Sequence, residues 1–127
     1  MFDRDGTVEQ LRADVQRVLL DGKSEINAAQ LEQLRFDAAD QIRHARSIAA
    51  EDPTTSNFIL TNKVFALTGT FFDIRQEWTP PPKQRLAVIR GVSPDLYALL
   101  CDFYQEPELQ EKIGIAERML SLVFPNK

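Results

Sequence analysis

Apolar residues that recur three or four positions apart are the feature that most constrains this fold. The chain has no strand-length run of alternating apolar and polar residues and no Asn-Gly hairpin turn. The helical spacing is clearest between Thr54 and Trp78, where one seam contains Leu60, Val64, Leu67, Phe71, Ile74 and Trp78. Because such a seam faces a neighbouring helix, we predict an all-α protein.

The same stretch has a second set of apolar residues. Phe58, Phe65 and Phe72 recur every seven positions. A helix that is apolar on two sides is usually central in a bundle, so we predict contacts on both of its faces. Small or polar residues lie on or beside this second face: Asn62, Gly69, Asp73 and Gln76. They fit either close helix packing at Gly69 or a groove with an apolar floor and a few polar anchors.

Further helices are predicted on both sides of this segment. One begins after Thr7 and ends near Gly22, with a stripe of Val8, Leu11, Val15, Val18 and Leu19. The others span about 27–50, 83–90 with Leu86 and Ile89 inward, a segment opened by Ser93 and Pro94, and 107–124. The short connections favour one antiparallel bundle of five to six helices over residues 1–127.

Composition limits the classes of function. The 127 residues suffice for one domain with a core, and a net charge of -4 argues against nucleic acid as a partner. The single cysteine, Cys101, and the single histidine, His44, cannot build a metal site of the His-rich or Cys-rich kind. No apolar run is long enough for a bilayer, and the N-terminus lacks a signal-peptide pattern, so we expect a cytoplasmic protein without a membrane partner.

The sequence "FFDIRQEWTPPPKQRL" places cations at a predicted bend. Three prolines, Pro80 to Pro82, separate the long helix from the next one. The bend is interpreted either as helix punctuation with solvated cations or as the rim of an anion site. Trp78 would end the seam and anchor the bend. The predicted anion or nucleotide-phosphate site contains Arg75, Trp78, Lys83 and Arg85, with Asn62 and Asp73 deeper in the adjoining groove.

Two stretches resemble nucleotidyltransferases of the kanamycin nucleotidyltransferase type. "FDRDGTVEQLR" is similar to the segment that leads from their catalytic domain into a helical C-terminal domain. "FFDIRQEWTPPPKQRL" resembles the motif in which a long helix of that domain ends, with Arg75, Trp78, Pro80 to Pro82 and Lys83 at the matching positions. The resemblance implies a substrate-binding helical bundle that packs against a nucleotidyltransferase catalytic domain in the same or a separate chain. In the same-chain case it implies that residues 1–6 are the remnant of a linker from an upstream catalytic domain.

The resemblance also exposes a gap. The family's catalytic domain has a Gly-Ser pair and, on a strand, an Asp-x-Asp site that holds Mg²⁺ against a nucleoside triphosphate. This chain has no Gly-Ser pair, and its Asp3-Arg4-Asp5 has the spacing but lacks the strand before it and the family context. We therefore expect no catalysis by the chain alone, and Mg²⁺ with a triphosphate only where a catalytic domain is present. The alternative is a protein–protein interaction bundle, for example a HEPN-like partner of a separate nucleotidyltransferase. The spaced Arg and His of a HEPN ribonuclease are missing, since Arg43 is adjacent to His44. A homo-oligomer is compatible with either interpretation.

Overall fold

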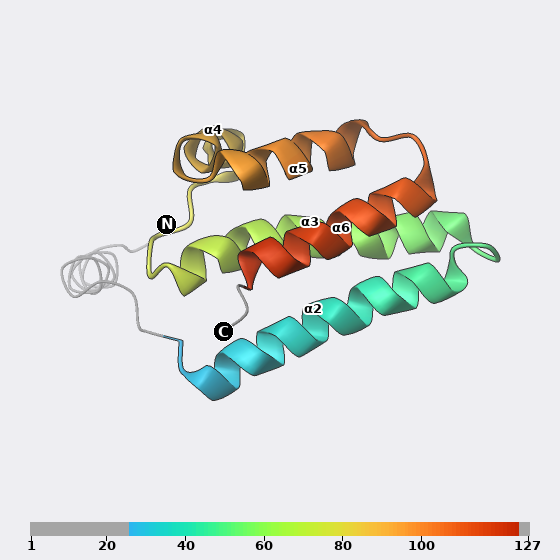
Figure 1. The fold of residues 1–127 in the computed structure, drawn as a ribbon, viewed down its shortest axis with the longest axis horizontal. Coiled ribbons are helices and arrows are strands. Elements are labelled where there is room, and N and C mark those ends of the chain that lie inside the picture. The colour runs from blue at the N-terminus through green and yellow to red at the C-terminus, as the bar shows by residue number, and fades with distance from the viewer. Residues whose placement is uncertain (1–25, 125–127) are drawn as a thin grey trace, which may run out of the picture.

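Every regular element in the described part of the chain is a helix. The computed structural model describes residues 26–124. Its helices are α2 (Ala28–Ile48), α3 (Pro53–Ile74), α4 (Pro82–Val92), α5 (Pro94–Gln105) and α6 (Leu109–Val123), as Figure 1 shows. This arrangement confirms the predicted all-α helical bundle. The helix predicted after Thr7 lies outside the described residues.

The helices form two hairpins and a crossing element. α2 and α3 are antiparallel, and α6 packs against both of them. α5 is antiparallel to α6 and packs on it, while α4 packs against α5 and is seen nearly end-on in Figure 1. The central position predicted for 54–78 is confirmed to the extent that α3 contacts both α2 and α6.

Three helix starts follow directly from local sequence. The Asn27 side chain accepts the backbone N–H of Gln30 at 2.7 Å, and the Gln30 side chain accepts that of Asn27 at 3.0 Å. This reciprocal cap satisfies two donors that the first turn of α2 leaves unpaired. Asp52 caps α3 and Ser93 caps α5, each followed by a proline at the first helical position. Such caps define where each helix begins and how short the connections are.

Small residues allow α2 and α3 to approach closely. Ala38 and Ala45 of α2 are buried, and so is its C-cap residue, Ala49. Ser56, in the first turns of α3, is fully buried, and its hydroxyl donates to the Ala45 carbonyl oxygen at 2.6 Å. This bond gives the buried hydroxyl the partner it needs and fixes one helix against the other.

The long helix ends four residues earlier than predicted. Gln76 has a positive φ of 59°, its N–H donates to Asp73 at 3.0 Å, and the Glu77 N–H donates to Phe72 at 2.9 Å. This pair of bonds is a Schellman ending, which normally has glycine at the left-handed position. Trp78 is therefore not the last residue of the seam. It lies beyond the helix with 48% of its surface exposed.

The buried face of α3 differs from the predicted pair of faces. Leu60, Val64 and Leu67 of the seam are buried, as predicted, whereas Phe71 and Ile74 are only partly buried. On the second face Phe72 is buried, but Phe58 and Phe65 are 74% and 46% exposed. The second face is thus covered only near the end of the helix.

The short helix α4 also differs from its prediction. Ile89 is buried as expected, but Leu86 is 42% exposed, so the prediction that Leu86 points inward is wrong. α4 also continues to Val92, two residues beyond the end predicted at about residue 90. The exposed Phe65 and Leu86 lie on α3 and α4, and this leaves apolar surface on both helices in contact with water.

Candidate functional site

Arg75 and Lys83 are at the two ends of the proline bend. Arg75 is the C-cap residue of α3, and its guanidinium pairs with the Glu77 carboxylate at 3.1 Å. The same guanidinium lies 5.5 Å from the centre of the Phe71 ring. Lys83 is exposed in the first turn of α4. Both of these contacts of the Arg75 side chain are thus with residues close to it in the sequence.

Arg85 is directed back toward α3. Its Nε–H donates to the Pro80 carbonyl oxygen at 2.9 Å, and Nη1 donates to the Thr68 hydroxyl at 3.1 Å. The guanidinium carbon lies 4.9 Å from the centre of the Phe65 ring, within the range of a cation–π contact. Arg85 therefore joins the start of α4, the proline bend and the second face of α3.

These contacts form one wall of a hollow of about 280 Å³. We call it the Arg85 groove, and define it by the residues that line it: Phe65, Thr68, Pro82, Arg85, Leu86 and Tyr104. Three helices contribute, because Tyr104 comes from the last turns of α5. Its lining is mostly apolar side chains with Arg85 and Thr68 as polar groups, which is the usual composition of a small-ligand site.

Of the six predicted site residues, only Arg85 lines this groove. Asn62 is exposed on α3, and Asp73 is partly buried in its last turn. Thr68, Leu86 and Tyr104 were not predicted as site residues. Thr68 could have been predicted, because it is polar and lies three positions after Phe65 on the same helix. Nothing in the sequence indicated that α5 would bring Tyr104 to the same place.

The pKa of the Tyr104 phenol differs from that of an ordinary tyrosine. Partial burial raises the pKa of its phenol above the ordinary tyrosine value, because desolvation disfavours the phenolate. The ring packs edge-to-face on the buried Phe103 ring, with centroids 5.1 Å apart. Its pKa is therefore a reporter of how well the groove is shielded from water.

This ionisation leads to a prediction about alkaline pH. A folded-state pKa above the unfolded value, about 10, means that stability is complete below that pH and falls as pH rises through the folded pKa. The ultraviolet absorbance of tyrosinate in a Tyr97→Phe variant, which retains only Tyr104 among tyrosines, would measure the shift. We expect titration at a higher pH than in the same protein unfolded by urea. Identical curves in the two states would contradict the burial of Tyr104.

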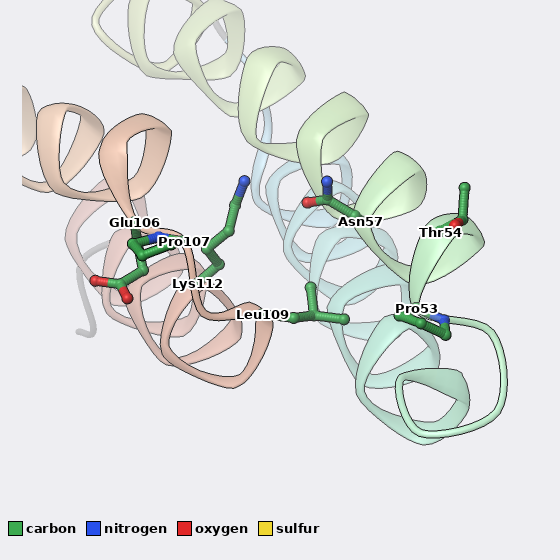
Figure 2. A pocket seen from close by; sticks show the side chains of 7 residues that line it. All are labelled: Pro53, Thr54, Asn57, Glu106, Pro107, Leu109 and Lys112. Atoms are coloured by element: carbon green, nitrogen blue, oxygen red, sulfur yellow. The ribbon is translucent and has the colours of Figure 1, made fainter.

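A second hollow lies at the opposite end of α3. It measures about 420 Å³ and is lined by Pro53, Thr54, Asn57, Glu106, Pro107, Leu109 and Lys112. Figure 2 shows it open between the first turns of α3 and the α5–α6 connection, with the Glu106 carboxylate directed away from Asn57. The Lys112 amino group lies 4.6 Å from the centre of the Phe103 ring. No buried polar group points into this hollow from the lining residues, so it is a weaker candidate than the Arg85 groove.

Two kinds of feature are absent from the described residues. Within residues 26–124, no group of three or more His, Cys, Asp or Glu side chains is placed to hold a metal ion. In the same range no helix is sufficiently long and apolar to cross a membrane. His44 is exposed, and the neighbouring Arg43 pairs with Asp40 at 3.2 Å.

Comparison with known proteins found no matching family model, no similar curated protein and no similar solved structure. The relation to nucleotidyltransferases therefore stays a prediction from the two sequence stretches that suggest it.

Proposed function

We propose that the chain is a ligand-binding helical domain without catalysis of its own, and that the Arg85 groove takes an apolar ligand with an anionic group. The observation that carries this proposal is the position of Arg85 in an otherwise mostly apolar lining. A guanidinium has five N–H donors, and Pro80 and Thr68 use two of them. The other donors are available for a carboxylate or phosphate, while Phe65, Leu86 and Tyr104 offer apolar surface.

The sequence resemblance places this proposal in a larger context. In a nucleotidyltransferase-like protein, the groove would bind substrate beside a catalytic domain that supplies Mg²⁺ and a nucleoside triphosphate. A nucleotide is one ligand of the required kind, since it joins a planar base to phosphates. The other predicted site residues do not line the Arg85 groove, so their part in binding an anion stays a prediction: Arg75, Trp78, Lys83, Asn62 and Asp73.

Two dyes test the proposal on the whole chain. Anilinonaphthalene sulfonate joins apolar rings to an anion, and N-phenylnaphthylamine is its uncharged counterpart. We expect Leu86→Glu to weaken sulfonate binding by about tenfold or more, because it replaces apolar surface with a like charge. Leu122→Glu is the matched control, since Leu122 is exposed on α6 outside the groove. Equal affinities of the two variants, by fluorescence titration, would rule out the groove as the site.

Arg85→Met tests the charge of the Arg85 side chain separately from its size. Methionine keeps much of the apolar stem but removes the donors, so the preference for the sulfonate over the uncharged dye should disappear. Titration of ATP and of pyrophosphate then shows whether a planar base is needed. Retained preference for the sulfonate in Arg85→Met would exclude Arg85 as the anion contact.

The exposed phenylalanines favour a second candidate function. Phe36 and Phe58 are 60% and 74% exposed on α2 and α3. Aromatic side chains are enriched in protein interfaces, so we propose as the alternative an interaction bundle that docks a nucleotidyltransferase chain. Co-expression with such a chain, from the same reading frame or a neighbouring gene, tests it. Loss of co-purification in Phe58→Ser would support this alternative, and unchanged co-purification would remove it.

A further inference from the structure

Arg85 is held in place by α3 and by the proline bend. Thr68 is 4% exposed, and its hydroxyl donates to the Phe65 carbonyl oxygen at 2.6 Å. The same hydroxyl oxygen accepts an Nη1–H of Arg85 at 3.1 Å, and the Pro80 carbonyl oxygen accepts its Nε–H at 2.9 Å. Because two of its five N–H groups are bonded in this way, the guanidinium is fixed in orientation at the wall of the groove.

The hydrogen bonds within the described residues leave three N–H groups of Arg85 for a ligand. The single N–H of Nε is used by Pro80, whereas Nη2 keeps both of its N–H groups and Nη1 keeps one. An anion is therefore expected to contact the terminal nitrogens of the guanidinium and not its Nε side. The two oxygens of a carboxylate match two N–H groups of this fork.

The charge of the groove matches a single negative charge. Among the described residues that line it, Arg85 is the only charged one. A carboxylate balances this charge, whereas a phosphate monoester carries about −1.5 to −2 at pH 7. In a lining of Phe65, Leu86 and Pro82, the excess negative charge of a phosphate would lose water without gaining a partner. Such desolvation is unfavourable, so the groove favours a monoanion.

The size of the groove favours a small ligand. Its volume of about 280 Å³ is just below the range of about 300–1,000 Å³ that is usual for small-molecule pockets. The rings of Phe65, Pro82 and Tyr104 provide apolar surface beside Arg85. One ring with a short acidic chain would be largely enclosed by such a groove, whereas a nucleoside triphosphate would leave most of its phosphates outside.

The hollow between α5 and α6 also contains an arginine but has different properties. It measures about 450 Å³ and is lined by Asp95, Ala98, Leu99, Arg118, Ser121 and Leu122. Arg118 is exposed, and Asp95 places a negative charge in the same hollow, which disfavours an anion there. The lining of the Arg85 groove contains no acidic residue, and its arginine is fixed by the buried Thr68. An anionic ligand is thus expected in the Arg85 groove.

We infer that the Arg85 groove selects a small apolar monocarboxylate over phosphate esters and nucleotides. The carboxylate binds the terminal nitrogens of Arg85, and Thr68 is a positioning residue that acts through Arg85. This inference rests on the proposed function, because it names which of the ligands allowed there the groove prefers.

Displacement of anilinonaphthalene sulfonate from the whole chain tests this selection. The competitors are phenylacetate, its uncharged amide phenylacetamide, and phenyl phosphate, which share one ring and a one-atom spacer. At pH 7.5 we expect phenylacetate to displace the dye at concentrations at least about tenfold lower than either of the others, because it alone both pairs with and neutralises Arg85. In Arg85→Met its advantage over phenylacetamide should vanish. Displacement by phenyl phosphate or ATP at the same concentrations as phenylacetate would overturn the inference.

The outcomes separate this inference from the proposed function. If dye binding requires Leu86 and Arg85 but phenyl phosphate competes as well as phenylacetate, the anion site stands and the selection of a monocarboxylate is refuted. If Leu86→Glu and Leu122→Glu bind the dye equally, the groove is not the site, and the proposed function fails together with the inference.

Thr68→Val and Thr68→Ser test the positioning role. Valine removes the hydroxyl with little change in volume, so the advantage of phenylacetate over phenylacetamide should fall by about threefold or more. Serine retains the hydroxyl and should retain the advantage. This ratio of two affinities within one variant is insensitive to a change in the amount of folded protein, which a merely structural role would cause. An unchanged ratio in Thr68→Val would overturn the assignment of Thr68 as a positioning residue.

Discussion

Truncation of Phe72 to alanine is expected to lower the free energy of unfolding by about 3–5 kcal/mol. Phe72 is 1% exposed and packs edge-to-face on Phe71, with ring centroids 5.2 Å apart. Removal of the ring would leave a cavity next to the end of α3, where Phe72 also provides the carbonyl for the Schellman ending. Urea denaturation followed by circular dichroism would measure the loss.

Phe58 provides a matched control on the same face of the same helix. It is 14 positions before Phe72, four helical turns away at nearly the same angle, and is mostly exposed. Phe58→Ala should therefore change the free energy of unfolding by no more than about 0.5 kcal/mol. Phe71→Ala should lie between the two, because Phe71 is only partly buried. Equal losses in the free energy of unfolding for Phe58→Ala and Phe72→Ala would contradict the burial of this face near the end of α3 alone.

The spacing of apolar residues predicted the helices well, because the buried residues of each helix lie along one stripe. The predicted helix over 27–50 is observed as Ala28–Ile48, and its buried residues Ala38, Ile42 and Ala45 follow one another at steps of four and three positions. The start of α5 was also predictable, since Ser93 and Pro94 form a local cap that needs no tertiary contact. Elements that local chemistry determines can be derived from sequence alone.

Two kinds of feature could not be predicted from the sequence. One is a left-handed backbone conformation at a residue other than glycine, and the other is a contact between residues far apart in the chain. Gln76 takes the left-handed conformation that usually signals glycine, so nothing in the sequence marked the end of α3 before Trp78. The cations at the bend were recognised, but their partners were not. Arg85 turns toward Phe65 and Thr68, about 20 positions earlier in the chain, whereas Arg75 pairs locally with Glu77. Whether Arg75 or Arg85 lines the groove depends on how α4 packs across the bundle, and this cannot be read from the local sequence.

Enlarging Ala45 to leucine should be the other strongly destabilising change. Ala45 is fully buried, and its carbonyl accepts the hydroxyl of the buried Ser56 across the α2–α3 contact. A leucine side chain there would force the two helices apart, at a cost of about 1–3 kcal/mol. If the separation also breaks the hydrogen bond, a buried hydroxyl loses its partner, which adds about 1–3 kcal/mol.

Two comparisons isolate these contributions. Ala29→Leu, at an exposed position of α2, adds the same side chain without crowding and should be nearly neutral. Ser56→Ala removes the hydroxyl without adding volume and should cost about 1 kcal/mol. If hydrogen-bond loss and crowding are coupled, Ala45→Leu combined with Ser56→Ala will destabilise by less than the sum of the two single changes. An additive double variant would mean that leucine is accommodated without separating α2 from α3, and that the close approach of these helices tolerates a larger side chain.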